Sequence, residues 1–221
     1  MHDPHVRYTA DEYDEFTGKF LATYDEMTTR RIAGELAGRS PGAVVLDVGT
    51  GTARLLVRFA RDPAFVAARL VGTDLYQDMI DRARRTIAEA GLGDRIELLV
   101  QDAHAMTDVP DASADVVLSR STIHHWTDPA RAFAEMYRVL RPGGVAFVHD
   151  VRRDPAPEAL AAFNRTRAAA GLGPSFLDEK YTTAEAAMFI DRAGLTAYTT
   201  IRAPESGLGG LGFEVEIRKP V

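Results

Sequence analysis

The sequence of 221 residues contains no cysteine. This absence excludes disulfide bonds, a thiolate nucleophile, a cysteine zinc site and an iron–sulfur cluster. The chain also lacks any apolar run close to the roughly 20 residues that a helix needs to cross a bilayer. A chain of this length can bury a core without cross-links, so we expect a soluble domain and no membrane partner.

The chain has no excess of positive charge: 32 acidic residues outnumber 26 lysines and arginines, and the net charge at pH 7 is -6. Neutralising phosphates requires a basic face, so nucleic acid is not expected as the main partner. The amino-terminal segment MHDPHVRYTADEYDEF is acidic and lacks the apolar stretch of a secretory signal. We therefore expect a cytoplasmic protein that is a monomer or a homodimer.

Short apolar runs alternate with segments of helical periodicity along most of the chain. The expected strands cover residues 44–48, 69–73, 96–100, 114–119 and 145–150. The expected helices cover residues 52–60, 77–90, 129–140 and 184–193. This alternation predicts parallel strands with right-handed crossovers, and hence a doubly wound, Rossmann-like α/β fold.

Three regions depart from this alternation. Residues 1–40 contain no strand pattern and are expected to form a helical cap on a core at 41–221. Residues 152–180 form a longer insertion on the expected substrate side. Two strand-like runs, 196–202 and 212–218, are joined by the glycine-rich segment ESGLGGL. So short a connection favours a hairpin, which gives the parallel sheet an antiparallel ending.

The first expected strand runs directly into a glycine-rich turn that contains Asp47, Gly49, Thr50 and Gly51. Ligands in open α/β sheets bind beyond the carboxyl ends of the strands, and glycines there let a ligand approach the backbone. A dinucleotide site requires G-x-G-x-x-G, but Ala53 and Arg54 follow Thr52 here. Asp47 would repel a phosphate, so a cationic ligand without phosphate suits the turn better. A tight turn without a ligand is the alternative.

Two more aspartates end the second and third expected strands. Asp74, followed by Leu75, can accept both ribose hydroxyls of a nucleoside that lies across the turn. Asp102, followed by Ala103, is suitably placed for the exocyclic amino group of adenine. Capping of a following helix is the alternative for both residues.

The loop after the fourth expected strand reads SRSTIHHW and begins at Ser119. His124 or His125 could take a proton from an acceptor hydroxyl or amine, because imidazole titrates near neutral pH. Pocket lining and packing are the alternatives, and two histidines without a third ligand make a poor metal site, so no metal is expected. Arg120 could bind a carboxylate of the donor or of an acidic acceptor, or it could be structural.

The expected cap and insertion are the parts of the chain available to cover an acceptor. Tyr13 and Tyr24 are candidate substrate contacts, with helix packing as the alternative. The insertion is basic, which suggests an anionic acceptor if its arginines are not simply solvated: they are Arg152, Arg153, Arg165 and Arg167.

Taken in order, VVLDVGTGTA, VGTD, QDA, ADVVLSRSTIHHWTDP and LRPGG resemble the class I S-adenosylmethionine-dependent methyltransferases. The chain is most similar to the small-molecule group that includes the ubiquinone and menaquinone biosynthesis enzymes. The resemblance implies a seven-stranded sheet with the last strand antiparallel. It also implies that Gly49 and Gly51 meet the methionine part of the donor, Asp74 the ribose and Asp102 the adenine. The expected donor-binding residues are Asp47, Gly49, Thr50, Gly51, Asp74, Leu75, Asp102, Ala103 and Ser119.

The leading hypothesis is therefore methyl transfer from S-adenosylmethionine to oxygen or nitrogen of a small molecule. A nicotinamide-dependent oxidoreductase is the first alternative, although Asp47 and the missing third glycine argue against it. A domain that binds the sulfonium nucleoside for a non-methylating role, such as internal alkylation, is the second alternative. The sequence departs from the family at Ala53, where many members have a third glycine.

Overall fold

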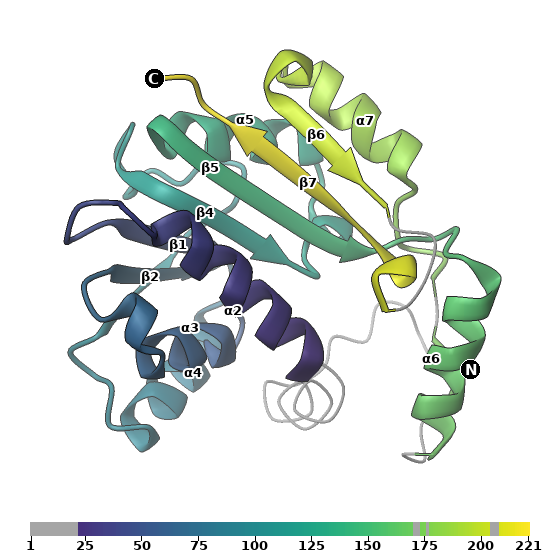
Figure 1. The fold of residues 1–221 in the computed structure, drawn as a ribbon, viewed down its shortest axis with the longest axis horizontal. Coiled ribbons are helices and arrows are strands. Elements are labelled where there is room, and N and C mark those ends of the chain that lie inside the picture. The colour runs from purple at the N-terminus through teal and green to yellow at the C-terminus, as the bar shows by residue number, and fades with distance from the viewer. Residues whose placement is uncertain (1–21, 170–172, 176, 204–207) are drawn as a thin grey trace.

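The computed structural model describes residues 22–169, 173–175, 177–203 and 208–221. They form a seven-stranded sheet in the order β3-β2-β1-β4-β5-β7-β6 (Figure 1). Its strands are β1 (Val44–Val48), β2 (Arg69–Asp74), β3 (Ile96–Val100), β4 (Ala114–Arg120), β5 (Leu140–Val151), β6 (Thr199–Arg202) and β7 (Gly212–Arg218). The helices are α2 (Ala22–Leu36), α3 (Arg54–Arg61), α4 (Gln77–Glu89), α5 (Pro129–Val139), α6 (Pro157–Ala169) and α7 (Thr183–Arg192).

The sheet is parallel from β3 to β5 and reverses at β7. The pairs β2–β3, β1–β2, β1–β4 and β4–β5 are parallel. β7 lies between β5 and β6 and is antiparallel to both. The predicted doubly wound α/β sheet with an antiparallel ending is therefore confirmed, and so is the predicted hairpin of the last two strands.

Both faces of the sheet are covered by helices, and alternate strand residues contribute to two separate cores. Val45 of β1 joins Ile32 of α2 and Phe59 of α3 in one core. The next residue of the strand, Leu46, joins Phe133 of α5 in the core on the other face. The central strands are nearly all apolar because helices cover them on both sides.

The largest differences between the expected and the observed boundaries are at the starts of β5 and β6. β5 begins at Leu140, which pairs with Ala114 of β4 before the register shifts. The expected strand began at 145 because an arginine, a proline and two glycines interrupt the apolar pattern between the two points. Residues Thr196–Tyr198 form a 3₁₀ turn, so the expected strand at 196–202 is regular only from Thr199 onward.

Helix α2 is the described part of the expected cap, and it crosses the near face of the sheet in Figure 1. Arg31 anchors it there, since its guanidinium lies 2.6 Å from a carboxylate oxygen of Glu216 in β7 and 4.8 Å from the ring centroid of Phe147 in β5. The amino-terminal end of α2 lies at the carboxyl ends of the strands, where Asp25 contacts Arg120 of β4. Helix α6, in the expected insertion, lies apart from the sheet beyond the end of β5 (Figure 1).

Candidate functional site

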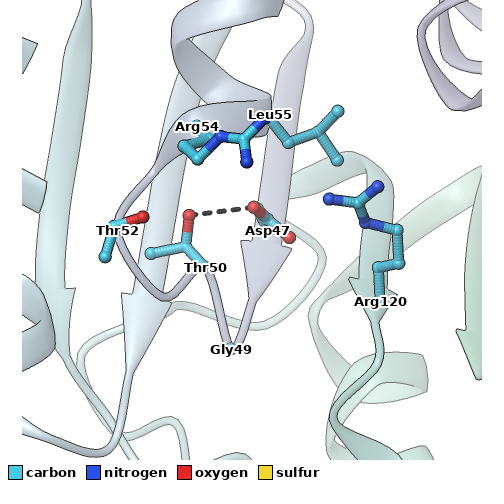
Figure 2. Close-up of a pocket in the computed structure, with 7 residues that line it drawn as sticks. All are labelled: Asp47, Gly49, Thr50, Thr52, Arg54, Leu55 and Arg120. Carbon is cyan, nitrogen blue, oxygen red and sulfur yellow. Dashed lines mark hydrogen bonds between the residues drawn. The ribbon is translucent and has the colours of Figure 1, made fainter. Parts of the chain in front are cut away.

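A pocket opens where β1 and β4 end, at the glycine-rich turn predicted to bind a ligand. Its lining residues are Asp47, Gly49, Thr50, Thr52, Arg54, Leu55 and Arg120 (Figure 2). The Thr50 hydroxyl donates a hydrogen bond of 2.8 Å to Oδ2 of Asp47. The side chains of Arg54 and Arg120 extend from opposite sides toward Asp47, so the pocket presents both signs of charge.

The backbone of this turn takes an unusual conformation. Gly49, Gly51 and Ala53 have φ of 74°, 57° and 61°, in the left-handed region that glycine tolerates best. A Cβ added at Gly49 would lie 2.5 Å from Cγ2 of Thr122, so a side chain there would displace the loop after β4. Ala53 adopts the left-handed conformation although it is not a glycine, and its side chain is fully buried.

Asp47 carries a buried carboxyl group whose pKa is raised from 3.8 to about 6. Desolvation is the main cause, and the charge of Asp74 adds to it, while the Thr50 hydrogen bond and the charge of Arg120 oppose it. A cation placed in the pocket would relieve this penalty, because an opposite charge favours the ionised carboxylate. The electrostatics of Asp47 therefore suit an ammonium group and disfavour a phosphate.

Asp74 supports the turn from the neighbouring strand. Its Oδ2 accepts a hydrogen bond of 2.9 Å from the Gly51 backbone, and its Oδ1 accepts one of 3.0 Å from the Tyr76 backbone. Asp74 is not the N-cap of α4, which was its alternative role. The N-cap residue is Tyr76, and its side chain forms no capping hydrogen bond. The side chains of Leu75 and Tyr76 are exposed beside it and offer an apolar surface to a nucleoside.

Asp102 follows β3 and is held by its own loop. Its Oδ1 accepts a hydrogen bond of 2.9 Å from the His104 backbone and lies 2.5 Å from Nδ1 of the His104 ring. Burial alone would raise the pKa of Asp102, but these His104 contacts and the charge of Arg131 hold it below its usual value. Asp102 is thus an ionised acceptor, and the half-buried Ala103 packs beside it against the core.

Ser119 and Arg120 lie at the end of β4 and have different surroundings. The buried Ser119 hydroxyl donates a hydrogen bond of 2.7 Å to the Val48 carbonyl and contacts the Thr122 hydroxyl, so it joins two strand ends. Arg120 forms an ion pair with Asp25 of α2, and the other carboxylate oxygen of Asp25 lies 3.5 Å from Arg54. The carboxylate of Asp25 therefore pairs with both arginines that line the pocket.

The predicted histidines lie together after β4, in the short turn Ile123–His125. Nδ1 of His124 lies 2.6 Å from Oδ2 of Asp150, a buried residue near the end of β5. Burial would raise the pKa of Asp150, but the hydrogen bond and charge of His124, together with Lys180, lower it. The carboxylate therefore stays ionised and fixes the orientation of the His124 ring.

The ring of His125 packs on that of His124, with 3.9 Å between the centroids. His125 is exposed as a residue, yet its ring lies close enough to neighbouring atoms for desolvation to lower its pKa to about 4. The charge of Lys180 lowers this pKa further, and so does that of His124 when it is protonated. Among the described residues, no carboxylate forms with the His125 ring the contact that Asp150 forms with His124.

Asp150 and Lys180 are site residues that the sequence reasoning missed. The expected fifth strand ended at Asp150, so an aspartate at a strand end beside the histidine loop was the available signal. Lys180 is mostly buried, and its ammonium lies 3.7 Å from a carboxylate oxygen of Glu179. No periodic or motif signal marks Lys180, because it lies in the insertion.

The remaining predicted contacts are less informative. Tyr13 and the side chain of Tyr24 lie outside the described residues. The insertion arginines bond within the protein: Arg152 to Asp154, Arg153 to Glu185, and Arg167 to the Gly173 carbonyl. Trp126, at the end of the histidine loop, is buried and meets the Phe133 ring edge-on with 5.8 Å between centroids, so it packs in the core.

Among the described residues, no cluster of three or more histidine, aspartate or glutamate side chains is arranged to hold a metal ion. No helix in the described ranges is both long and apolar enough to span a membrane.

The known proteins that this chain resembles in sequence and in fold are methyltransferases. Residues 46–148 match the methyltransferase domain family. The phosphatidylethanolamine N-methyltransferase of Cereibacter sphaeroides is 34% identical over 70% of this chain and 73% of its own length. The 27-O-demethylrifamycin SV methyltransferase of Amycolatopsis mediterranei is 33% identical over 69% of this chain. The ubiquinone/menaquinone biosynthesis C-methyltransferase of Hydrogenovibrio crunogenus is 31% identical over 72% of this chain.

The matched part of the chain spans 59% of the Amycolatopsis protein and 64% of the Hydrogenovibrio protein. A crystal structure of an S-adenosylmethionine-dependent methyltransferase from Aquifex aeolicus superimposes with a TM-score of 0.68. It is 18% identical and covers 96% of this chain and 98% of its own, so this likeness concerns the fold.

Proposed function

Because the chain belongs to the class I S-adenosylmethionine-dependent methyltransferases, we propose that it methylates an oxygen or nitrogen of a small molecule, with His124 as the general base. When bound, the donor supplies an electrophilic methyl group on a sulfonium. The observation that carries the proposal is the buried contact of 2.6 Å between His124 and Asp150.

The residues of the pocket fit the donor. Asp47 is a buried carboxyl whose raised pKa would fall beside the donor's ammonium, and Arg120 is a cation for the donor's carboxylate. Asp74 ends β2 beside the glycine turn, where its carboxylate can serve as an acceptor for the ribose hydroxyls. A nicotinamide dinucleotide would instead place its pyrophosphate near Asp47, which the charge of that carboxylate opposes.

The role of His124 follows from its partner. The ionised Asp150 accepts a hydrogen bond from Nδ1–H of His124, which leaves Nε2 as the basic nitrogen of the neutral ring. Nε2 can then take the proton of an acceptor hydroxyl or amine, and Asp150 stabilises the resulting imidazolium. In the same transfer the acceptor atom would gain the methyl carbon, and the methyl–sulfur bond of the sulfonium would break to leave a neutral thioether. Proximity of acceptor and donor lowers the rest of the barrier.

We infer the kind of acceptor atom from the residues of the site, because the relatives methylate different kinds of atom. Their names specify O-, N- and C-methylation. A carboxylate-oriented imidazole suits an acceptor that must lose a proton, such as a hydroxyl or an amine. Lys180, whose charge acts on both Asp150 and His125, favours an acceptor that develops negative charge.

The test combines binding with product analysis. The protein should bind S-adenosylhomocysteine in calorimetry, and mass spectrometry should reveal acceptors that gain one methylene unit. His124→Gln should then slow turnover by about 100-fold, the scale of a lost general base, while donor affinity stays unchanged. His125→Gln is the matched control and should retain most of the turnover. Equal losses in the two variants would assign no base role to His124.

A further inference from the structure

His104 lies outside the predicted site, yet it makes three directed contacts between site elements. Its ring Nδ1 lies 2.5 Å from Oδ1 of Asp102. Its ring Nε2 lies 3.1 Å from the backbone nitrogen of Asp128, the N-cap residue of α5. Its carbonyl accepts a hydrogen bond of 2.8 Å from Nε of Arg131. The ring side chain is only 14% exposed.

These contacts fix the protonation pattern of the ring. The Asp128 backbone N–H is a donor, so Nε2 must supply a lone pair to accept its hydrogen bond. The proton of the neutral ring therefore resides on Nδ1, which donates to Asp102. A protonated ring would set Nε2–H against Asp128 N–H, so the neutral Nδ1–H form is the one that satisfies both contacts.

The same contacts engage only one of the two carboxylate oxygens of Asp102. Both hydrogen bonds from His104, from its backbone and from its ring, go to Oδ1. None of the described residues donates a hydrogen bond to Oδ2, and the Asp102 side chain remains 46% exposed. Oδ2 is therefore placed to accept a hydrogen bond from a ligand.

We propose that His104 is a positioning residue for the donor's adenine: it fixes Asp102 through Oδ1 and leaves Oδ2 for the exocyclic amino group. The proposal rests on the donor site proposed above. His104 also ties the Asp102 loop to the loop that carries His124, because Asp128 follows that loop directly. One imidazole thus connects the nucleoside side of the site with the acceptor side.

Two substitutions separate the two ring contacts. His104→Gln places an amide near the position of Nε2, where its oxygen can accept from Asp128 but cannot reach Asp102. His104→Asn places an amide near the position of Nδ1, where its nitrogen can donate to Asp102 but cannot reach Asp128. Calorimetry with S-adenosylhomocysteine and S-inosylhomocysteine measures recognition of the amino group, because the inosine analogue lacks it.

The parent should bind the adenosine compound about tenfold more tightly than the inosine analogue, the scale of a hydrogen bond to a charged group. His104→Gln should lose most of this discrimination, and His104→Asn should keep it. Nitrogen NMR of the parent should show, besides His124, a histidine in the neutral Nδ1–H form whose signals disappear in both His104 variants.

Other outcomes overturn the proposal. Unchanged discrimination in His104→Gln would reduce His104 to a packing residue. So would an Nε2–H form for the ring whose NMR signals disappear in the His104 variants. Loss of discrimination in both variants with equally lowered melting temperatures would assign it a structural role. A parent that binds the adenosine compound without discrimination refutes the inference alone, whereas a parent that binds neither compound refutes the proposed function as well.

Discussion

His124 and Asp150 meet across two neighbouring strands, with 2.6 Å between Nδ1 of the imidazole and Oδ2 of the carboxylate. β4 and β5 run parallel and pair Arg120 with His149, so their carboxyl ends lie side by side. The loop after β4 then returns His124 to the end of β5. The contact depends on strand order, which places two residues distant in sequence at one edge of the sheet.

Asp150→Asn should abolish most of the turnover and leave donor binding intact. An asparagine amide can donate to Nδ1, which would move the His124 proton to Nε2 and remove the base. We expect turnover to fall by about 100-fold or more, with a loss similar to that of His124→Gln. The double variant should be no slower than either single variant, and additive losses in steady-state rates would contradict a shared role.

Asp74→Asn should weaken both donor binding and folding. The carboxylate accepts hydrogen bonds from the Gly51 and Tyr76 backbones, and an amide has only one acceptor oxygen to replace two. An unsatisfied buried donor costs about 1–3 kcal/mol, so chemical denaturation should detect a loss of this size without any ligand. A variant of parental stability that binds S-adenosylhomocysteine like the parent would leave Asp74 without either role.

Asp47→Asn should stabilise the free protein at neutral pH. The folded state raises the pKa of Asp47 from 3.8 to about 6, so it binds more protons than the unfolded state in this range. Stability therefore falls as the pH rises from about 4 to 6. Because one pKa unit is worth about 1.4 kcal/mol, the variant should gain about 1–3 kcal/mol at pH 7 and nothing near pH 4.

Urea denaturation at the two pH values measures this gain, and Asp94→Asn, which alters an exposed carboxylate, is the control. The same Asp47 variant should bind S-adenosylhomocysteine more weakly, because the donor's ammonium loses its counter-charge. A gain of equal size at both pH values would attribute the stabilisation to something other than the titration of Asp47.

Asp25→Asn should tighten donor binding. Asp25 pairs with Arg120 and lies 3.5 Å from Arg54, so its carboxylate competes with that of the donor for the same cations. We expect the affinity for S-adenosylhomocysteine to rise by about three- to fivefold, the range of a partly solvated ion pair. Glu26→Gln is the matched control, since Glu26 pairs with Arg30 on the exposed side of α2. Weaker binding in Asp25→Asn would instead make Asp25 part of the donor site.

Local sequence signals predicted the elements well where pattern and turn chemistry agree. α5 begins at Pro129, as expected, and Asp128 caps its first turn. β5 was expected to begin later than it does, because its first residues lack the apolar pattern although Leu140 is fully buried. The periodicity of apolar residues indicates which positions of a segment are buried. It gives no signal where pairing with a neighbouring strand extends a strand through polar residues.

The site was predictable only as far as its residues lie at strand ends. Asp47 and Asp74 follow from that rule, and the structure brings both to the glycine turn. Asp25 and Lys180 come from outside the alternating core, and their positions depend on how α2 and the insertion pack. The role of His104 depends on the direction of its two ring nitrogens, which no sequence pattern encodes.

The position of β7 has a consequence for biosynthesis. This strand follows all the others in the chain, yet it lies inside the sheet with Phe213, Val215 and Ile217 fully buried. Until it emerges from the ribosome, β5 presents an unpaired apolar edge, the kind of surface on which nascent chains associate with one another. The sheet therefore reaches its final width only after synthesis of β7, and ribosome-bound chains that end before Gly212 should depend on chaperones.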